Sequence, residues 1–172
     1  MATINCNDTL AVACHRIFAA DLNEHGTLFG GRILDLVDRE ASIAAMRVER
    51  QTVVTATFDH VDFVAPFKID DSMCLEAYVT GFGSRSIEVF AKVTGEHLKT
   101  GDRFLGFTCF ATFVIDEPDA QVKFEQVIPT TPEQQQTCAH YADRVALRRQ
   151  TRQASLALSQ HIDTAFPWSN KN

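Results

Sequence analysis

Residues 21–48 read DLNEHGTLFGGRILDLVDREASIAAMRV, a polar loop that runs through a Gly-Gly pair into the clearest helical pattern of the chain. The apolar residues of this pattern recur every three to four positions, as they do on the buried face of a helix: Leu34, Val37, Ala41, Ala44 and Val48. Ala45 adds a third alanine near this stripe, so another element can approach closely. We expect a helix from Gly31 to about Val48 that buries one face.

The segments on either side of this helix have patterns typical of β-strands. They cover residues 9–18, 51–63, 72–80, 86–94 and 103–115. The turns between the last three are short and contain Gly81, Gly83 and Gly101. Short connections predict that sequential strands are antiparallel neighbours, and a single helix must bury its stripe against their sheet. The sequence thus predicts an α+β fold with one long helix wrapped by an antiparallel β-sheet.

The C-terminal region predicts a further helix. Thr131 suits an N-cap, Pro132 suits the first helical position and Gln134 completes a capping box. The pattern continues to about Ile162, but it is loose and rich in Gln, Arg and Ala, which is typical of a surface or interface helix. We therefore predict a single domain in residues 1–130 and a C-terminal helical extension in residues 131–172.

The composition narrows the classes of partner. The chain of 172 residues has a formal net charge of -6, which disfavours a nucleic-acid partner because phosphate contact needs a basic surface. The longest uncharged apolar stretch, residues 104–115, is too short to span a membrane. The first residues lack the features of a secretory signal, so we expect a cytoplasmic protein. Its five cysteines and scattered histidines show no metal-ligand spacing, which predicts free thiols and no metal.

Several motifs of known enzyme classes do not occur in the sequence, among them G-x-S-x-G, the P-loop, G-x-G-x-x-G, H-E-x-x-H and C-x-x-C. Chemistry would then depend on a carboxylate and hydrogen bonds. Asp38 lies on one shoulder of the buried stripe, where partial desolvation favours a reactive carboxylate. Glu40 lies at a similar angle on the other shoulder. Periodicity alone does not choose between these two carboxylates.

Besides these carboxylates, the loop and the start of the helix offer amide groups that can donate hydrogen bonds. Gly30 and Gly31 have no side chains, so the first amides of the helix can face a ligand and stabilise a developing oxyanion. The alternative is an ordinary tight turn into a helix. Asn23 can orient a water molecule or a carbonyl through its amide, although most loop asparagines only satisfy local turns.

Several motifs together resemble the hotdog-fold acyl-CoA thioesterases, in particular the cytosolic brain-type acyl-CoA hydrolases and their single-domain relatives. The motifs that carry the resemblance are Asp21-x-Asn23-x-x-Gly26-x-x-Phe29-Gly30-Gly31, Asp38-x-x-Ala41, Val54-x-Ala56, Asp59-His60-Val61-Asp62-Phe63-x-x-Pro66, Gly83-x-Arg85-Ser86-x-Glu88-Val89 and the Thr100-Gly101 turn. Each is weak alone, and their combination over about residues 10–116 is specific. Many relatives have a histidine where this chain has Phe29, so an imidazole at that position is not expected here.

The resemblance implies an acyl-CoA thioester hydrolase and assigns roles to individual residues. Asp38 would act as base or nucleophile and Asn23 would position water or substrate, with the two residues coming from opposite subunits. Amides at Gly30 and Gly31 would polarise the thioester carbonyl. Arg85 and Ser86 match the region that contacts coenzyme A, whose phosphates suit an arginine.

The resemblance also implies a homo-oligomer built from hotdog dimers and no cofactor, because coenzyme A is part of the substrate. The alternative to a hydrolase is a module that binds acyl-CoA without hydrolysing it, in which Asp38 and Asn23 would have no chemical task. A third possibility, a hotdog dehydratase, would need a paired histidine and carboxylate, and the loop offers no clear histidine for that pair.

Overall fold

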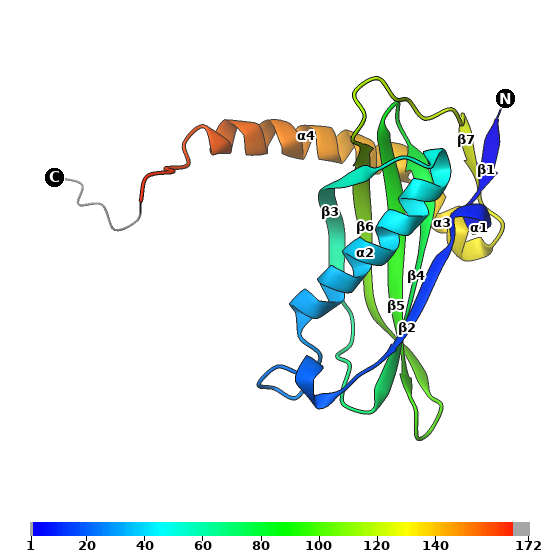
Figure 1. Ribbon diagram of the computed structural model, residues 1–172, viewed down its shortest axis with the longest axis vertical. Coiled ribbons are helices and arrows are strands. Elements are labelled where there is room, and N and C mark those ends of the chain that lie inside the picture. The colour runs from blue at the N-terminus through cyan, green and yellow to red at the C-terminus, as the bar shows by residue number, and fades with distance from the viewer. Residues whose placement is uncertain (1, 167–172) are drawn as a thin grey trace. The chain divides into compact units, whose positions relative to one another are not determined.

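The computed structural model describes residues 2–166, and its contacts divide the chain into two compact units, Met1–Cys138 and Ala139–Asn172. The first unit contains a five-stranded sheet with a long helix along one face (Figure 1). Its strands are β2 (Ala11–Arg16), β3 (Val53–Phe63), β4 (Asp71–Phe82), β5 (Ser86–His97) and β6 (Arg103–Ile115). The helix is α2 (Gly30–Glu49). The predicted α+β architecture of one helix on one antiparallel sheet is confirmed.

The order of the strands corrects one expectation. The sheet runs β2-β4-β5-β6-β3, and all its pairings are antiparallel. Thus β3 does not pair with β4, although only residues 64–70 separate them in sequence. The chain crosses over this connection from β3, at one edge of the sheet, to β4, the second strand from the other edge, and β2 forms that edge beside β4. Strand β2 is also shorter than the predicted 9–18, because Cys6–Thr9 form a helical turn, α1, before it.

The core lies between α2 and the inner face of the sheet. Four of the five residues of the predicted helical stripe are buried, namely Val37, Ala41, Ala44 and Val48, whereas Leu34 is partly buried. The strands contribute side chains that alternate inward, such as Leu75 on β4 and Val89 on β5, both with no exposed surface. The alanines have the consequence foreseen from the sequence, since small side chains let the sheet pack closely against the helix.

A bulge in β6 explains why its phenylalanines recur every three residues. Val93 pairs with Phe107 and Thr94 with Leu105, so Gly106 is an extra residue on β6. The extra residue puts both Phe104 and Phe107 against the core, whereas Phe110 packs with Phe90 in a separate outer cluster. A Cβ at Gly106 would lie 2.1 Å from the ring of Phe67, so only glycine fits there.

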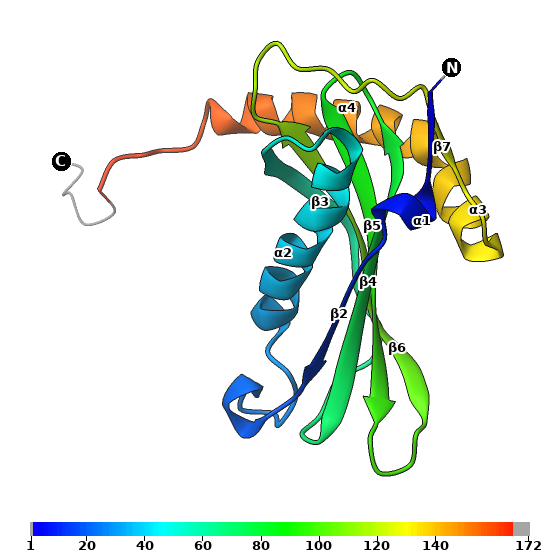
Figure 2. The same cartoon turned by 45° about the vertical axis from the view of Figure 1, so that its right-hand side comes forward.

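The outer face of the sheet has a cover that the sequence did not predict. Here α1 lies beside α3 (Pro132–Ala139), next to a parallel pair of short strands, β1 (Thr3–Asn5) and β7 (Gln126–Ile128) (Figure 2). Tyr78 of β4 donates a hydrogen bond to Glu133 of α3 at 3.0 Å and contacts Thr137 at 3.2 Å. Tyr78 is buried in this cluster, and burial raises the pKa of its hydroxyl. The outer cluster thus fixes the start of the C-terminal region to the sheet.

The predicted C-terminal helix is confirmed, but it is not one continuous element. It is divided into α3 and α4 (Tyr141–Ser159), and His140 lies between them. Thr131 accepts a hydrogen bond from the Gln134 amide as an N-cap does, but the side chain of Gln134 bonds to Thr130 instead of completing the box. Residues 167–172 of the predicted extension lie outside the described residues. The domain boundary at residue 130 stays a prediction.

Candidate active site

The loop before α2 is held in shape by Asn23. Its side-chain oxygen accepts hydrogen bonds from the amides of His25 and Thr27 at 3.0 and 3.1 Å, and its amide nitrogen donates to the Thr27 hydroxyl at 3.1 Å. Gly26 closes the turn with a positive φ of 73°. Further along, Leu28 donates its amide to the Phe67 carbonyl, which fixes the loop to the segment after β3. One amide hydrogen of Asn23 remains available for another partner.

The first turn of α2 presents free backbone donors. The helix begins at Gly30, beyond the loop that Asn23 holds (Figure 2), and the Gly30 and Gly31 amides make no hydrogen bond to any of the residues 2–166. Exposed aromatic side chains flank these donors, because Phe29 is 59% and Phe63 is 55% exposed. A Cβ at Gly31 would lie 2.7 Å from the Phe29 ring, and one at Gly30 would lie 3.2 Å from Phe63. The pair of glycines therefore makes room for aromatic rings as well as for the helix start.

Asp38 is held by a residue that the sequence did not single out. The hydroxyl of Thr55 on β3 donates a hydrogen bond of 2.6 Å to Asp38 Oδ1. The quoted motif Val54-x-Ala56 passed over this position, because a threonine in a strand is ordinary. The signal that could have found it is its place near the start of the strand after the helix, on a residue type that can donate to a carboxylate.

The neighbouring carboxylates differ from Asp38. Asp35 forms ion pairs with Arg32 at 2.9 Å and Arg39 at 2.8 Å on the exposed side of the helix. Glu40 is half-buried and has no hydrogen bond or ion pair within the described part of the chain. A strand hydroxyl thus orients Asp38 and not Glu40, a distinction that the helical period could not make.

Ser86 is the first residue of β5, and Arg85 lies just before it in the hairpin turn that follows β4. The Arg85 guanidinium donates to the Ile115 carbonyl at 2.7 Å, while the Ile115 amide donates back to the Arg85 carbonyl at 3.0 Å. Gly83 donates its amide to the Ser86 carbonyl at 2.8 Å, which closes the turn. The Arg85 side chain therefore holds the end of β6. Its contact with coenzyme A, and that of Ser86, stay predictions.

The structure brings some predicted residues together and leaves others apart. Asp38 lies seven residues after Gly31 on one helix, which separates them by about 10 Å along its axis. No hydrogen bond joins Asn23 to Asp38 within residues 2–166. The described residues include no group of three or more acidic, histidine or cysteine side chains that could hold a metal ion. None of their helices is long and apolar enough to cross a membrane.

Comparisons with known proteins agree on one family. Residues 25–101 match the thioesterase superfamily. The Bacillus subtilis protein YkhA, described as an uncharacterized acyl-CoA thioester hydrolase, is 42% identical over 164 residues, which cover 95% of each chain. A hexameric acyl-CoA thioesterase is 30% identical, with a TM-score of 0.81 over 88% of this chain and 98% of that one.

A Staphylococcus aureus acyl-CoA hydrolase adds information on individual residues. It is 25% identical, with a TM-score of 0.86 over 94% of this chain and 100% of that one. Its structure has been solved in complex with butyryl coenzyme A, coenzyme A and coenzyme A disulfide. Variants in which one aspartate, one threonine or one asparagine is replaced by alanine have also been solved.

Proposed function

The chain belongs to the thioesterase superfamily of hotdog proteins, and from this premise we propose that it hydrolyses acyl-CoA thioesters to a free carboxylic acid and coenzyme A. The 42% identity to YkhA extends over nearly the full length of both chains, so it covers the loop, the helix and the strands that carry the candidate site. A fold alone would not support a reaction, because one fold hosts many functions. The support comes from the site residues.

One spacing carries the assignment of these residues. In the S. aureus hydrolase the replaced aspartate follows the replaced asparagine by 15 residues and precedes the replaced threonine by 17. The same two intervals separate Asn23, Asp38 and Thr55. The hydrogen bond from Thr55 to Asp38 independently links two of the three. We therefore infer that Asn23, Asp38 and Thr55 act together in catalysis.

Asp38 acts as the general base or as the nucleophile. The Thr55 hydroxyl donates a hydrogen bond to Oδ1 of Asp38 and so restricts rotation of the carboxylate. The other oxygen, Oδ2, is therefore held in one direction, which a reactive group needs. As a base, Oδ2 takes a proton from water while the water oxygen attacks the thioester carbon. The tetrahedral intermediate then expels coenzyme A thiolate, which takes up the proton as the carbon–sulfur bond breaks.

The amides of Gly30 and Gly31 stabilise the oxyanion in this scheme. They are free donors at the positive end of the α2 dipole, where negative charge develops on the carbonyl oxygen. Asn23 supplies its remaining amide hydrogen to the attacking water or the substrate. The loop contacts that occupy its other polar atoms hold that hydrogen in one direction.

A single chain does not bring these groups to one thioester. An attacking water must lie within hydrogen-bond reach of its base, and the carbonyl oxygen must lie about 3 Å from its donors. The separation of about 10 Å along the helix between Gly31 and Asp38 exceeds that span. We propose that Asp38 of one subunit works with Asn23 and Gly31 of another, so that each site lies between two chains.

The exposed apolar side chains around the site fit this assembly. Val54 on the edge strand β3 is 47% exposed, and Ile43 and Met46 on α2 are each 40% exposed. A monomer would leave these side chains and the open edge of β3 in water. We propose a homo-oligomer built from hotdog dimers, in line with the hexameric assembly described for the relative of 30% identity.

Coenzyme A is part of the substrate, and the proposed reaction uses no other cofactor. We propose that the hairpin with Arg85 and Ser86 contacts it, which requires a part of the Arg85 guanidinium not engaged by Ile115. The five free cysteines suit the cytoplasm, which we propose as the location.

Paired substitutions on α2 test the reaction and its residue. The full-length protein is given acyl-CoAs of increasing chain length, and hydrolysis is followed by the loss of thioester ultraviolet absorbance, which the protein's own thiols do not disturb. We expect Asp38→Asn to lower kcat by about 10³ or more at an unchanged melting temperature. Glu40→Gln removes the same charge two residues away and should stay within about two-fold of wild type.

Three results would contradict the proposal in different ways. Wild-type turnover in Asp38→Asn would remove Asp38 from the reaction. An equal loss in Glu40→Gln would show that the effect is only electrostatic. Acyl-CoA binding by the wild type without any hydrolysis would identify the chain as a non-catalytic acyl-CoA-binding module.

A further inference from the structure

Two cysteines lie directly opposite each other on neighbouring strands at the edge of the sheet. Cys14 of β2 is the register partner of Cys74 of β4, and their sulfurs are 3.0 Å apart. Cys74 alternates with the buried Met73 and Leu75, so its side chain points to the outer face of the sheet, away from α2. Two thiols held in this way need little backbone movement to form a bond.

Access to solvent separates Cys14 from the other cysteines. Cys14 is exposed, Cys74 and Cys138 are half-buried, and Cys6 and Cys109 are fully buried. A second pair exists between Cys6 and Cys138, with sulfurs 3.7 Å apart, but Cys6 lies inside the outer cluster. A soluble reagent therefore reaches Cys14 first. The second pair provides an internal control in the same chain.

We propose that Cys14 and Cys74 form a reversible dithiol–disulfide site that is oxidised by small soluble disulfides. Both are free cysteines in the structure. None of the residues assigned to thioester hydrolysis takes part, so the two proposals stand independently. The chemistry is shared by glutathione disulfide and by the disulfide of coenzyme A, the thiol that the proposed reaction releases.

The reaction proceeds by two exchanges. Cys14 thiolate attacks one sulfur of the small disulfide, which breaks its sulfur–sulfur bond, releases one small thiol and leaves a mixed disulfide on Cys14. Cys74 then loses its proton and attacks the Cys14 sulfur, which forms the bridge and expels the second small thiol. Two cysteine thiols are oxidised by two electrons, and one small disulfide is reduced to two thiols.

The environment of Cys74 suits the thiol that attacks in the second exchange. Burial, followed by the hydrogen bond and the charge of Cys14, raises the pKa of Cys74 to about 11. It is therefore protonated at neutral pH while the exposed Cys14 reacts. Once Cys14 is in a mixed disulfide, its hydrogen bond to Cys74 and its charge no longer raise the pKa of Cys74, so Cys74 ionises more readily. The order of attack follows from this asymmetry.

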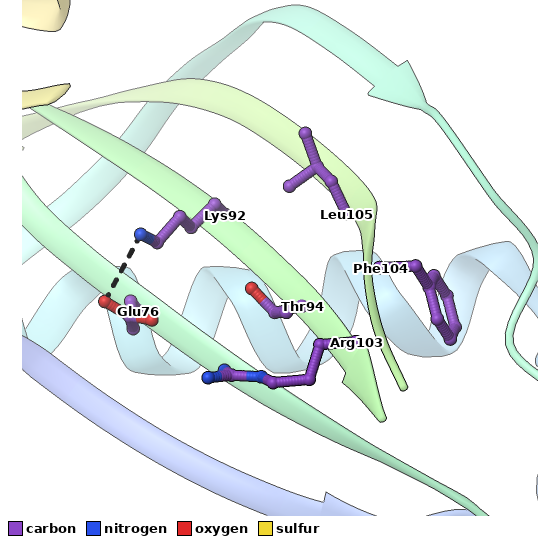
Figure 3. A pocket seen from close by; sticks show the side chains of 6 residues that line it. All are labelled: Glu76, Lys92, Thr94, Arg103, Phe104 and Leu105. Atoms are coloured by element: carbon purple, nitrogen blue, oxygen red, sulfur yellow. Dashed lines mark ion pairs between the residues drawn. The ribbon is translucent and has the colours of Figure 1, made fainter. Parts of the chain in front are cut away.

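A shallow depression beside the pair can receive the small disulfide. It is lined by Glu76, Lys92, Thr94, Arg103, Phe104 and Leu105 (Figure 3). Thr94 of β5 is the register partner of Cys74, and Glu76 lies two residues after Cys74 on β4, which places the depression next to the thiol. Figure 3 shows Lys92 paired with Glu76, whereas Arg103 points away from Leu105 with no ion pair to any residue in the described part of the chain. Its guanidinium can bind a carboxylate or phosphate of the reagent.

The bridge would close a large loop. The two cysteines are 60 residues apart, and the segment between them contains Asn23, Gly31, Asp38 and Thr55. Closing such a loop restricts the unfolded chain, so we expect oxidation to raise the melting temperature by about 5 °C or more. A reducing agent should reverse this shift, which a merely irreversible modification would not allow.

Mass spectrometry of the full-length oligomer tests the site. The reduced protein is incubated with glutathione disulfide or coenzyme A disulfide, remaining thiols are alkylated, and the intact mass and linked peptides are determined. We expect the loss of two hydrogens per chain and a peptide that joins Cys14 to Cys74. The faster of the two reagents identifies the source of the oxidant.

Single substitutions give the decisive pattern. Cys74→Ser should retain the small thiol as an adduct on Cys14, Cys14→Ser should form neither bridge nor adduct on Cys74, and Cys138→Ser should form the bridge within about two-fold of the wild-type rate. An unchanged mass, a stable adduct on the wild type, a Cys6–Cys138 bridge or a bridge between chains would each overturn the proposal.

Discussion

The two halves of α2 serve opposite needs. From Ala41 to Val48 the helix contributes small side chains, and Ala41, Ala44 and Ala45 have no exposed surface. From Gly30 to Asp38 it combines buried residues such as Val37 with free amides and a half-exposed carboxylate. The buried face of the second half is complete within one chain, because the sheet covers its alanines. The first half is incomplete, because the Gly30 and Gly31 amides have no hydrogen-bond partner among residues 2–166, and we propose that a bound substrate supplies one.

This difference teaches that packing and chemistry can be divided along one helix. The close approach of the sheet to the alanines fixes the position of the helix, and that position holds Asp38 against Thr55 on β3. A site with a rigid support keeps its geometry better than one placed only on loops. The following predictions test each half, beginning with the largest effect.

Mixing two inactive variants would show whether the first half of α2 is completed by another chain. Asn23→Ala and Asp38→Ala each remove one proposed member of every site, so each alone should have less than about 1% of wild-type activity. After subunit exchange, mixed dimers would hold one site with both residues intact. We expect recovery of about a quarter of wild-type activity.

The double variant provides the control for this mixture. Asn23→Ala combined with Asp38→Ala in one chain, mixed with either single variant, cannot rebuild a site from two chains and should stay inactive. If the two single variants exchange subunits by native mass spectrometry but recover no activity, Asn23 and Asp38 do not come from opposite subunits.

A larger side chain on the buried face of the second half of α2 should destabilise the fold. Ala44→Leu adds volume where the helix contacts the sheet and has no room, so we expect the free energy of unfolding to fall by about 1–3 kcal/mol. Ile43 is the residue just before Ala44 but is 40% exposed, so Ile43→Leu should change the free energy of unfolding by less than about 0.5 kcal/mol. Urea denaturation measures both, and equal stabilities of the two variants would contradict the close packing of the alanines.

Removing the hydroxyl that orients Asp38 should have the smallest effect of the three. Thr55→Val keeps the shape of the side chain but not the donor, so we expect kcat/KM to fall by about ten-fold with little change in melting temperature. Thr55→Ser retains the donor and should recover most of the activity. Equal activity in the valine and serine variants would show that the hydrogen bond does not support catalysis.

Much of this architecture was predicted from local patterns. The helical stripe from Val37 to Val48 and the strand patterns of residues 72–94 gave the right elements, because burial of one face imposes its period on the sequence. The pairing of β3 was not predictable in this way, because the order of strands depends on contacts between distant segments. The break at His140 was missed as well, since the loose apolar pattern of the tail gave no sign of it.

The candidate site divides along a similar line. The sequence by itself determined that Asp38 lies on the edge of a buried stripe and that two glycines open the helix, because helical period and backbone freedom are local properties. Only the tertiary structure decided which carboxylate is oriented, because Thr55 reaches Asp38 across the space between β3 and α2. It also decided that Cys14 faces Cys74, since register between distant strands is set by the packing of the whole sheet.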